Sequence, residues 1–160
     1  MPTFDPTRRL ARSFTWGELV ITNHRSLYES NAQESAAVLP ALTSLAAMLQ
    51  TVRDHYGVPV MVHSGYRGPA LNEAIGGSKS SQHMRGEAAD FHVAGHGLRE
   101  VFVWLRDCSG LPYGQIILEG SIPNRPTWVH LSLGEPWRRL EDCRQPMTWD
   151  RSNGYRWARG

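Results

Sequence analysis

The stretch 80–93, SSQHMRGEAADFHV, places a histidine and a carboxylate seven residues apart with small residues between them. His83 lies in a segment typical of a loop, and Asp90 lies in an apolar segment that alternates as a strand does. An imidazole and a carboxylate are both zinc ligands, so the stretch indicates either an ordinary turn that leads into a strand or two thirds of a metal site. Gly86 and Ala88 would let the chain turn tightly and pack closely beside a metal.

Two further polar side chains come from segments that also alternate as strands. Residues 127–133 (TWVHLSL) place His130 on a polar face, and residues 114–120 (GQIILEG) place Glu119 on another. His83 and Asp90 together with His130 would form an open zinc site, with the fourth position left for water. Such a site lowers the pKa of a bound water to about 7.

The other histidines have weaker claims to a functional role. His24, His55 and His96 are read as ordinary surface or core residues. His63 and His92 remain open, because they could be plain polar positions or partners that orient a metal ligand.

Three motifs carry a resemblance to a known family. The chain contains the pattern S-x-H-x-x-G-x-A-x-D at 81–90, SGYR at 64–67 and WVH at 128–130. In this order they resemble the zinc D-Ala-D-Ala carboxypeptidase and L-Ala-D-Glu endopeptidase family, which cleaves the stem peptides of peptidoglycan and includes phage endolysins. The resemblance runs from about Phe14 to Leu133, so it covers most of the chain.

The resemblance implies a role for each matched residue. His83, Asp90 and His130 would be the zinc ligands. Arg67 would hold a carbonyl or carboxylate group of the substrate, for which a planar guanidinium with paired donors is suited. Ser81 would lie at the pocket edge and bind substrate or a ligand, unless it is simply a turn serine.

The general base is assigned differently from many relatives. Those relatives place an acid three residues before the last histidine ligand, where this chain has Thr127. A phage-type branch of the family instead carries Q-x-x-x-E, which Gln115 and Glu119 match. Glu119 is also the only acid between Gly114 and Leu133. We therefore hypothesise that Glu119 is the catalytic general base, assisted by Arg67.

The elements around these motifs predict an α+β fold, with a small antiparallel sheet and helices packed on one side, similar to hedgehog and D-Ala-D-Ala peptidase domains. Apolar residues at spacings of three and four predict helices over 38–56 and 97–107. Residues 69–77 predict a brief helix, and the segment from 59 predicts a short strand that runs into the SGYR loop.

The chain is expected to be a single zinc peptidase domain over residues 1–160. Residues 1–35 are predicted to be an irregular N-terminal arm with one helical turn at TWGEL, and residues 134–160 a C-terminal extension. The aromatic and arginine residues of that extension could grip an anionic polymer, but a last strand with its packing is the favoured interpretation.

Composition limits the partners. The 160 residues are 41% apolar and 20% charged, with a net charge of +2, so a globular domain is expected and neither nucleic acid nor a membrane surface is favoured. Two cysteines are too few for a disulfide scaffold. No stretch of about 18 apolar residues is expected to span a membrane, and no signal peptide is evident.

The predicted activity is zinc-dependent hydrolysis of peptidoglycan stem peptides by a monomer. D-Ala-D-Ala carboxypeptidase and L-Ala-D-Glu endopeptidase activities both remain open. The alternatives are a zinc-bearing binding module without turnover, as in the hedgehog signalling domain, and a structural component of a phage particle or secretion device. Synthesis in the cytoplasm is expected, with action on the cell wall after phage-type lysis or another route of release.

Overall fold

The computed structural model describes residues 1–120, 126–134, 145–150 and 154–157, and it has an α+β fold. Its strands are β1 (Arg9–Ala11), β2 (Phe14–Thr15), β3 (Val60–Ser64), β4 (Ala88–Val93), β5 (Tyr113–Gly120), β6 (Trp128–Leu133), β7 (Gln145–Asp150) and β8 (Gly154–Trp157). Its α-helices are α1 (Tyr28–Glu34), α2 (Leu39–Tyr56), α3 (Pro69–Ala74) and α4 (Leu98–Asp107). Short 3-10 helices are η1 (Gly17–Val20), η2 (Arg25–Leu27), η3 (Ser35–Val38) and η4 (Gln82–Arg85).

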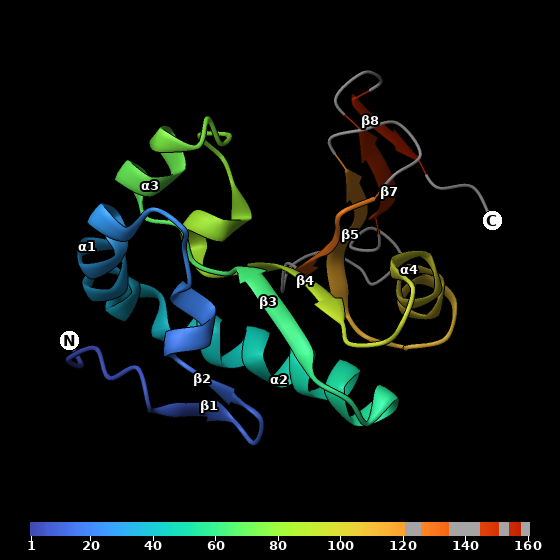
Figure 1. Ribbon diagram of the computed structural model, residues 1–160, viewed down its shortest axis with the longest axis horizontal. Coiled ribbons are helices and arrows are strands. Elements are labelled where there is room, and N and C mark those ends of the chain that lie inside the picture. The colour runs from blue at the N-terminus through green and yellow to red at the C-terminus, as the bar shows by residue number, and fades with distance from the viewer. Residues whose placement is uncertain (121–125, 135–144, 151–153, 158–160) are drawn as a thin grey trace.

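The main sheet has the strand order β3-β4-β6-β5-β7-β8. Its pairs are antiparallel, as predicted, except that β5 and β7 run parallel. β6 lies between β4 and β5 although it follows both in sequence, so the strands that carry Asp90 and His130 become neighbours. β7 and β8 extend the sheet beyond β5 (Figure 1), in agreement with the prediction that the C-terminal extension contributes a last strand.

The helix α2 forms where its apolar spacing predicts. Pro40 lies in its first turn, and Gly57 ends it with a left-handed φ of 68° and an N–H bond to the carbonyl of Arg53. Leu42, Leu45, Leu49 and Val52 are fully buried along one face. Burial stabilises the fold by about 1.5–3 kcal/mol for each such side chain, so this face anchors the helix to the sheet.

The two faces of the main sheet differ in chemistry. One face presents apolar side chains that form a single core with α2 and α4: Ala89, Phe91, Val93, Ile116, Leu118, Val129 and Leu131. In Figure 1 α2 lies below β3, and α4 lies to the right of β5. Because successive residues of a strand point to opposite faces, Asp90, Glu119 and His130 lie on the other face. The predicted alternation is therefore confirmed.

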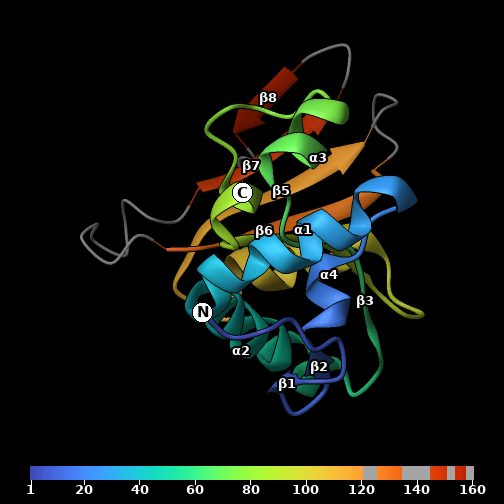
Figure 2. The ribbon, with the colours of Figure 1, turned by 90° about the vertical axis from the view of Figure 1, so that its left-hand side faces the viewer.

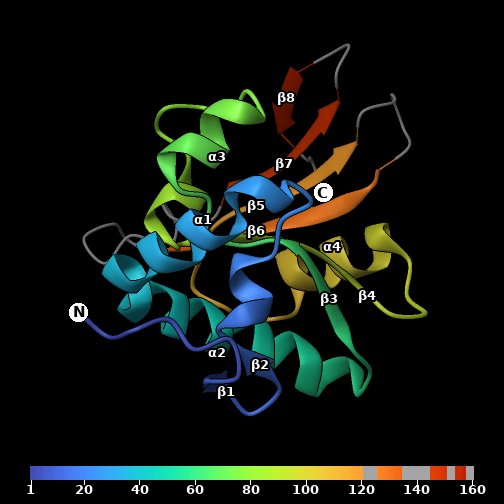
Figure 3. The ribbon, with the colours of Figure 1, turned by 60° about the vertical axis from the view of Figure 1, so that its left-hand side comes forward.

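The first 35 residues are more structured than the predicted irregular arm. They contain the β1–β2 hairpin, two 3-10 helices and α1. Trp16 is fully buried, and its indole N–H donates to the Ser35 hydroxyl at 2.8 Å. Figures 2 and 3 show the hairpin beside α2, at the end of the molecule away from β8. The predicted helical turn at TWGEL agrees with η1. The prediction of an otherwise irregular arm was wrong because the apolar residues here follow no single period, and tertiary contact with the core orders them.

The continuous helical run Arg25–Tyr56 also corrects an expectation. It is long and apolar enough, by length and composition alone, to cross a membrane, whereas the sequence suggested no such stretch. Its apolar side chains on α2 are buried against the sheet, which is how a core helix of a globular domain uses them.

The structure describes one of the two cysteines. Cys108 is a free, exposed thiol, and Cys143 lies outside the described residues.

Candidate active site

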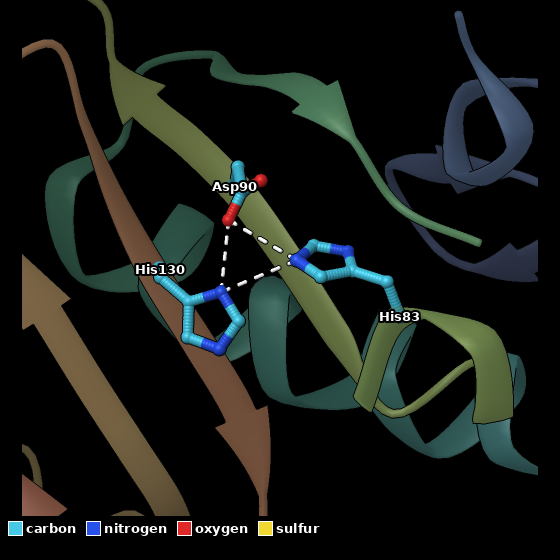
Figure 4. A group of neighbouring side chains, drawn as sticks. All are labelled: His83, Asp90 and His130. Atoms are coloured by element: carbon cyan, nitrogen blue, oxygen red, sulfur yellow. Dashed lines mark hydrogen bonds and ion pairs between the residues drawn. The ribbon is translucent and has the colours of Figure 1, made fainter. Parts of the chain in front are cut away.

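Three side chains from separate elements converge on one point (Figure 4). The distances are 3.3 Å from His83 Nε2 to Asp90 Oδ1, 2.9 Å from His130 Nδ1 to Asp90 Oδ1, and 3.2 Å between the two imidazole nitrogens. All three residues are buried. The structure therefore brings together the three ligands that the sequence predicts.

Strand pairing positions two of the three residues. Asp90 on β4 and His130 on β6 are direct cross-strand partners, and such partners have Cβ atoms about 4.5–5.5 Å apart on the same face. The register of two neighbouring strands is therefore sufficient to place the carboxylate beside the imidazole.

A tight turn brings the third residue to the other two. His83 lies in η4, which ends at Gly86 with a φ of 68°. A Cβ at Gly86 would come within 3.0–3.1 Å of the Val38 and Leu42 side chains. Glycine is thus required here both by its backbone conformation and by the closeness of the core, which explains the small residue in the motif.

The outer hydrogen bonds set the state of each imidazole. His83 Nδ1 lies 2.7 Å from the carbonyl oxygen of Gly65, which can only accept, so Nδ1 carries the proton and Nε2 presents a lone pair to the centre. His130 Nε2 lies 3.3 Å from Gln82 Oε1, an arrangement that leaves its Nδ1 facing the centre. This outer support is what orients histidine ligands in metal sites.

The arrangement fits a zinc ion. Two ligands on tetrahedral zinc with bonds of 2.0–2.1 Å lie about 3.3–3.4 Å apart. The three observed separations of 2.9, 3.2 and 3.3 Å are close to this spacing. Two imidazoles and one carboxylate also match the donor set of an open catalytic site, which leaves a fourth position for water or substrate.

The electrostatics favour the forms that bind a metal. Burial alone would raise the pKa of Asp90, but His83 and His130 outweigh it and hold the pKa well below its usual range. Burial lowers the pKa of His83, although Asp90 opposes the shift. An ionised carboxylate and a neutral imidazole are therefore available at neutral pH, as metal binding requires.

Arg67 lies in the loop after β3, and this loop is tied to η4. Its backbone N–H donates to the carbonyl of His83 at 3.1 Å, while Gly65 of the same loop accepts from the His83 ring. Burial has the largest effect on the pKa of His83 and of Glu119. The positive charge of Arg67 acts on both groups as a smaller effect that lowers the pKa. The structure thus brings Arg67 to the site, and its contact with substrate stays a prediction.

A buried asparagine outside the motifs holds the same loop. Asn31 on α1 is 2% exposed, and its amide donates to the carbonyls of Val20 and Tyr66 at 3.3 Å each. Its side-chain oxygen accepts from the Gly68 N–H at 2.7 Å. Asn31 therefore bonds to the residues on both sides of Arg67. The sequence analysis missed it, because a single asparagine in an amphipathic segment carries no recognisable signal.

Glu119 lies on the predicted face, two residues further along β5 than Ile117, the residue that pairs with His130. It pairs with Trp128, whereas His130 pairs with Ile117, and its Oε2 accepts from the indole N–H of Trp128 at 2.8 Å. Burial raises the pKa of Glu119, with His130 opposing and Asp90 adding to the shift. A carboxylate with a raised pKa is suited to exchange protons at neutral pH, but its catalytic role remains a prediction.

Ser81 immediately precedes η4 and is half-buried. Its backbone N–H donates to the carbonyl of Ser78, and its own carbonyl accepts from the N–H of Met84. These bonds are those of a turn residue, and the role of the hydroxyl in substrate binding stays a prediction.

The comparison with known families agrees with the geometry. A family model described as Peptidase M15 matches residues 13–132, which include all six predicted site residues. The resemblance stated from the motifs is confirmed by this match. No curated protein matched the chain.

Proposed function

This chain belongs to the peptidase M15 family, a family of zinc enzymes, and from that membership we propose that it hydrolyses peptidoglycan stem peptides at a D-Ala-D-Ala or an L-Ala-D-Glu bond. One observation carries the proposal. His83, Asp90 and His130 present three ligand atoms to one point from buried positions, 2.9–3.3 Å apart. A bound zinc would act there as a Lewis acid that polarises the scissile carbonyl and lowers the pKa of water.

Glu119 moves the proton in the proposed reaction. As a carboxylate it accepts the proton of the attacking water, and as a carboxylic acid it then donates that proton to the leaving amine. The raised pKa of Glu119 supports both steps, because a carboxyl group with a raised pKa can both accept a proton and donate it within one turnover. The Trp128 indole orients the carboxylate through the 2.8 Å hydrogen bond.

Arg67 holds the substrate in this proposal. Its guanidinium can pair with a carboxylate through two parallel hydrogen bonds, or stabilise the negative charge that develops on the carbonyl oxygen. The bonds from Asn31 and His83 to its loop support such a role, because a bidentate contact requires a fixed backbone. Ser81 would contribute a hydroxyl at the edge of the same site.

A binding module without turnover is the second candidate. The observation that favours it is Thr127, which stands where many relatives have the catalytic acid. Thr127 is exposed, and its backbone N–H donates to the carbonyl of Glu119 at 2.6 Å. In our proposal Glu119 replaces that missing acid from the neighbouring strand, so its function decides between the two candidates.

The proposed partner and place of action follow from the substrate. The chain would act as a monomer on the bacterial cell wall, after release by phage-type lysis or another route. No nucleic-acid partner or membrane span is part of the proposal.

Digestion of purified peptidoglycan by the pure protein tests the function. The reaction is run with the zinc-loaded protein, with a chelator, and with zinc added back, and the products are read by mass spectrometry. Zinc-dependent release of terminal D-Ala would identify a carboxypeptidase, and new D-Glu amino termini would identify an L-Ala-D-Glu endopeptidase. A protein that holds one zinc ion but cleaves neither bond would contradict the proposal and favour the binding module.

A further inference from the structure

A second pair of imidazoles lies on β3 and β4 and has no part in the proposed function. His63 Nε2 and His92 Nδ1 are 2.7 Å apart, and their rings stack with centroids 4.9 Å apart and planes inclined by 23°. His63 is exposed and His92 is half-buried, so solvent reaches the pair. Both residues were left open by the sequence analysis.

A β-bulge brings the two rings together. Met61 pairs with His92 and Val62 with Phe91, but the next pair is Ser64 with Asp90, so the register shifts at His63. A bulge of this kind inserts one residue and redirects its side chain, often beside an active site. The extra residue at the bulge is therefore the one that contacts His92.

We propose that His63 Nε2 and His92 Nδ1 bind a second transition-metal ion, with Zn²⁺ as the physiological candidate and water in the remaining positions. The two nitrogens need to separate from 2.7 Å to only about 3.3 Å to bind one tetrahedral ion. That change needs a small ring rotation, and the exposed His63 ring has room for it.

This second site differs from the first in strength. Among the described residues, only His83, Asp90 and His130 gather three potential ligand atoms, whereas the exposed pair supplies two. The exposed pair also lacks a charged ligand, so it binds zinc more weakly than the buried cluster and fills second. A bound ion would link β3, which leads into the Arg67 loop, to β4, which carries Asp90.

Counting bound zinc tests the proposal without any use of peptidase activity. Protein loaded with one equivalent of zinc is dialysed against increasing free Zn²⁺, and bound metal is measured by elemental analysis. The wild-type protein is expected to take up a second equivalent, whereas His63→Ala and His92→Ala bind only one. His24→Ala is the matched control, because it removes another exposed histidine and should retain both equivalents.

Thermal unfolding supplies a second measurement. An ion that binds only the folded state raises its stability, and the increase grows with the free ion concentration above Kd. Zinc beyond the first equivalent should therefore raise the Tm of the wild-type and His24→Ala proteins but not that of His63→Gln, which keeps a polar side chain at the bulge. The proposal is overturned if the wild type stops at one equivalent, or if the His63 and His92 variants still bind two.

Discussion

The proposed metal ligands on the strands and the site residues on η4 and the Arg67 loop are held in two different ways. Asp90 and His130 are direct partners in adjacent strands, so the sheet register alone places them. His83 lies in the short 3-10 helix η4 and Arg67 in the loop after β3, and their positions depend on hydrogen bonds between these two segments and on Asn31 from α1. The position of Arg67 thus depends on α1, which lies outside the motifs. Changes in α1 should therefore disturb the half of the site that contains His83 and Arg67 (the loop half), while the half on the strands, Asp90 and His130, keeps its geometry.

Removal of a metal ligand should have the largest effect. His83→Ala deletes one of three ligands, and the remaining pair of Asp90 and His130 forms too incomplete a set for a catalytic zinc. We expect the loss of the tightly bound zinc equivalent and of all zinc-dependent cleavage, measured by elemental analysis at limiting zinc and by product release from peptidoglycan. His24→Ala is the control. If His83→Ala bound zinc as tightly as the wild type, the buried cluster would not be the metal site.

Glu119→Gln should have the next largest effect. The substitution keeps the shape of the side chain but removes its ability to accept a proton, which should lower kcat by about 10²–10⁴. The tightly bound zinc equivalent should be retained, because Glu119 is not one of the proposed ligands. A Glu119→Gln protein with near wild-type kcat would assign the proton transfer to another group.

Asn31→Ala breaks the support of the loop half. It leaves two carbonyls and one N–H without their partner, at a cost of about 1–3 kcal/mol in the free energy of unfolding. We also expect KM to rise more than kcat falls, because the Arg67 loop loosens while Asp90 and His130 keep their register.

The exposed Gln33 on the same helix offers a matched control, and Gln33→Ala should change stability by no more than about 0.5 kcal/mol. Both variants are compared by urea unfolding and by steady-state kinetics. If kcat fell as much as KM rose, and both changes followed the loss of stability, Asn31 would support the fold without positioning Arg67.

The smallest expected effect is a shift in pH dependence. The Trp128 indole donates to Glu119 and so favours the ionised carboxylate, and Trp128→Phe should raise the pKa of Glu119 further. A general base is active above its pKa and loses activity as the pH falls through it, so the acidic limb of kcat/KM should move to higher pH. An unchanged acidic limb would mean that another group controls it.

The cluster of proposed zinc ligands was predictable because motif and period agree. Strand alternation places Asp90 and His130 on one face, and the spacing of the motif supplies His83, all without knowledge of the fold. The same alternation correctly placed Glu119. The N-terminal segment was not predictable in this way, because Trp16 and Asn31 acquire their surroundings only from contacts with α2 and the Arg67 loop.

The amino-acid sequence by itself determined the local chemistry of this protein: which residues can bind zinc, which face of each strand they occupy, and why Gly86 must be small. Tertiary structure alone decided that β6 lies between β4 and β5, that Asn31 supports Arg67, and that a bulge joins His63 to His92. The physical reason is range. Side-chain period and turn preference act over a few residues, whereas strand order and loop support depend on which distant surfaces bury one another.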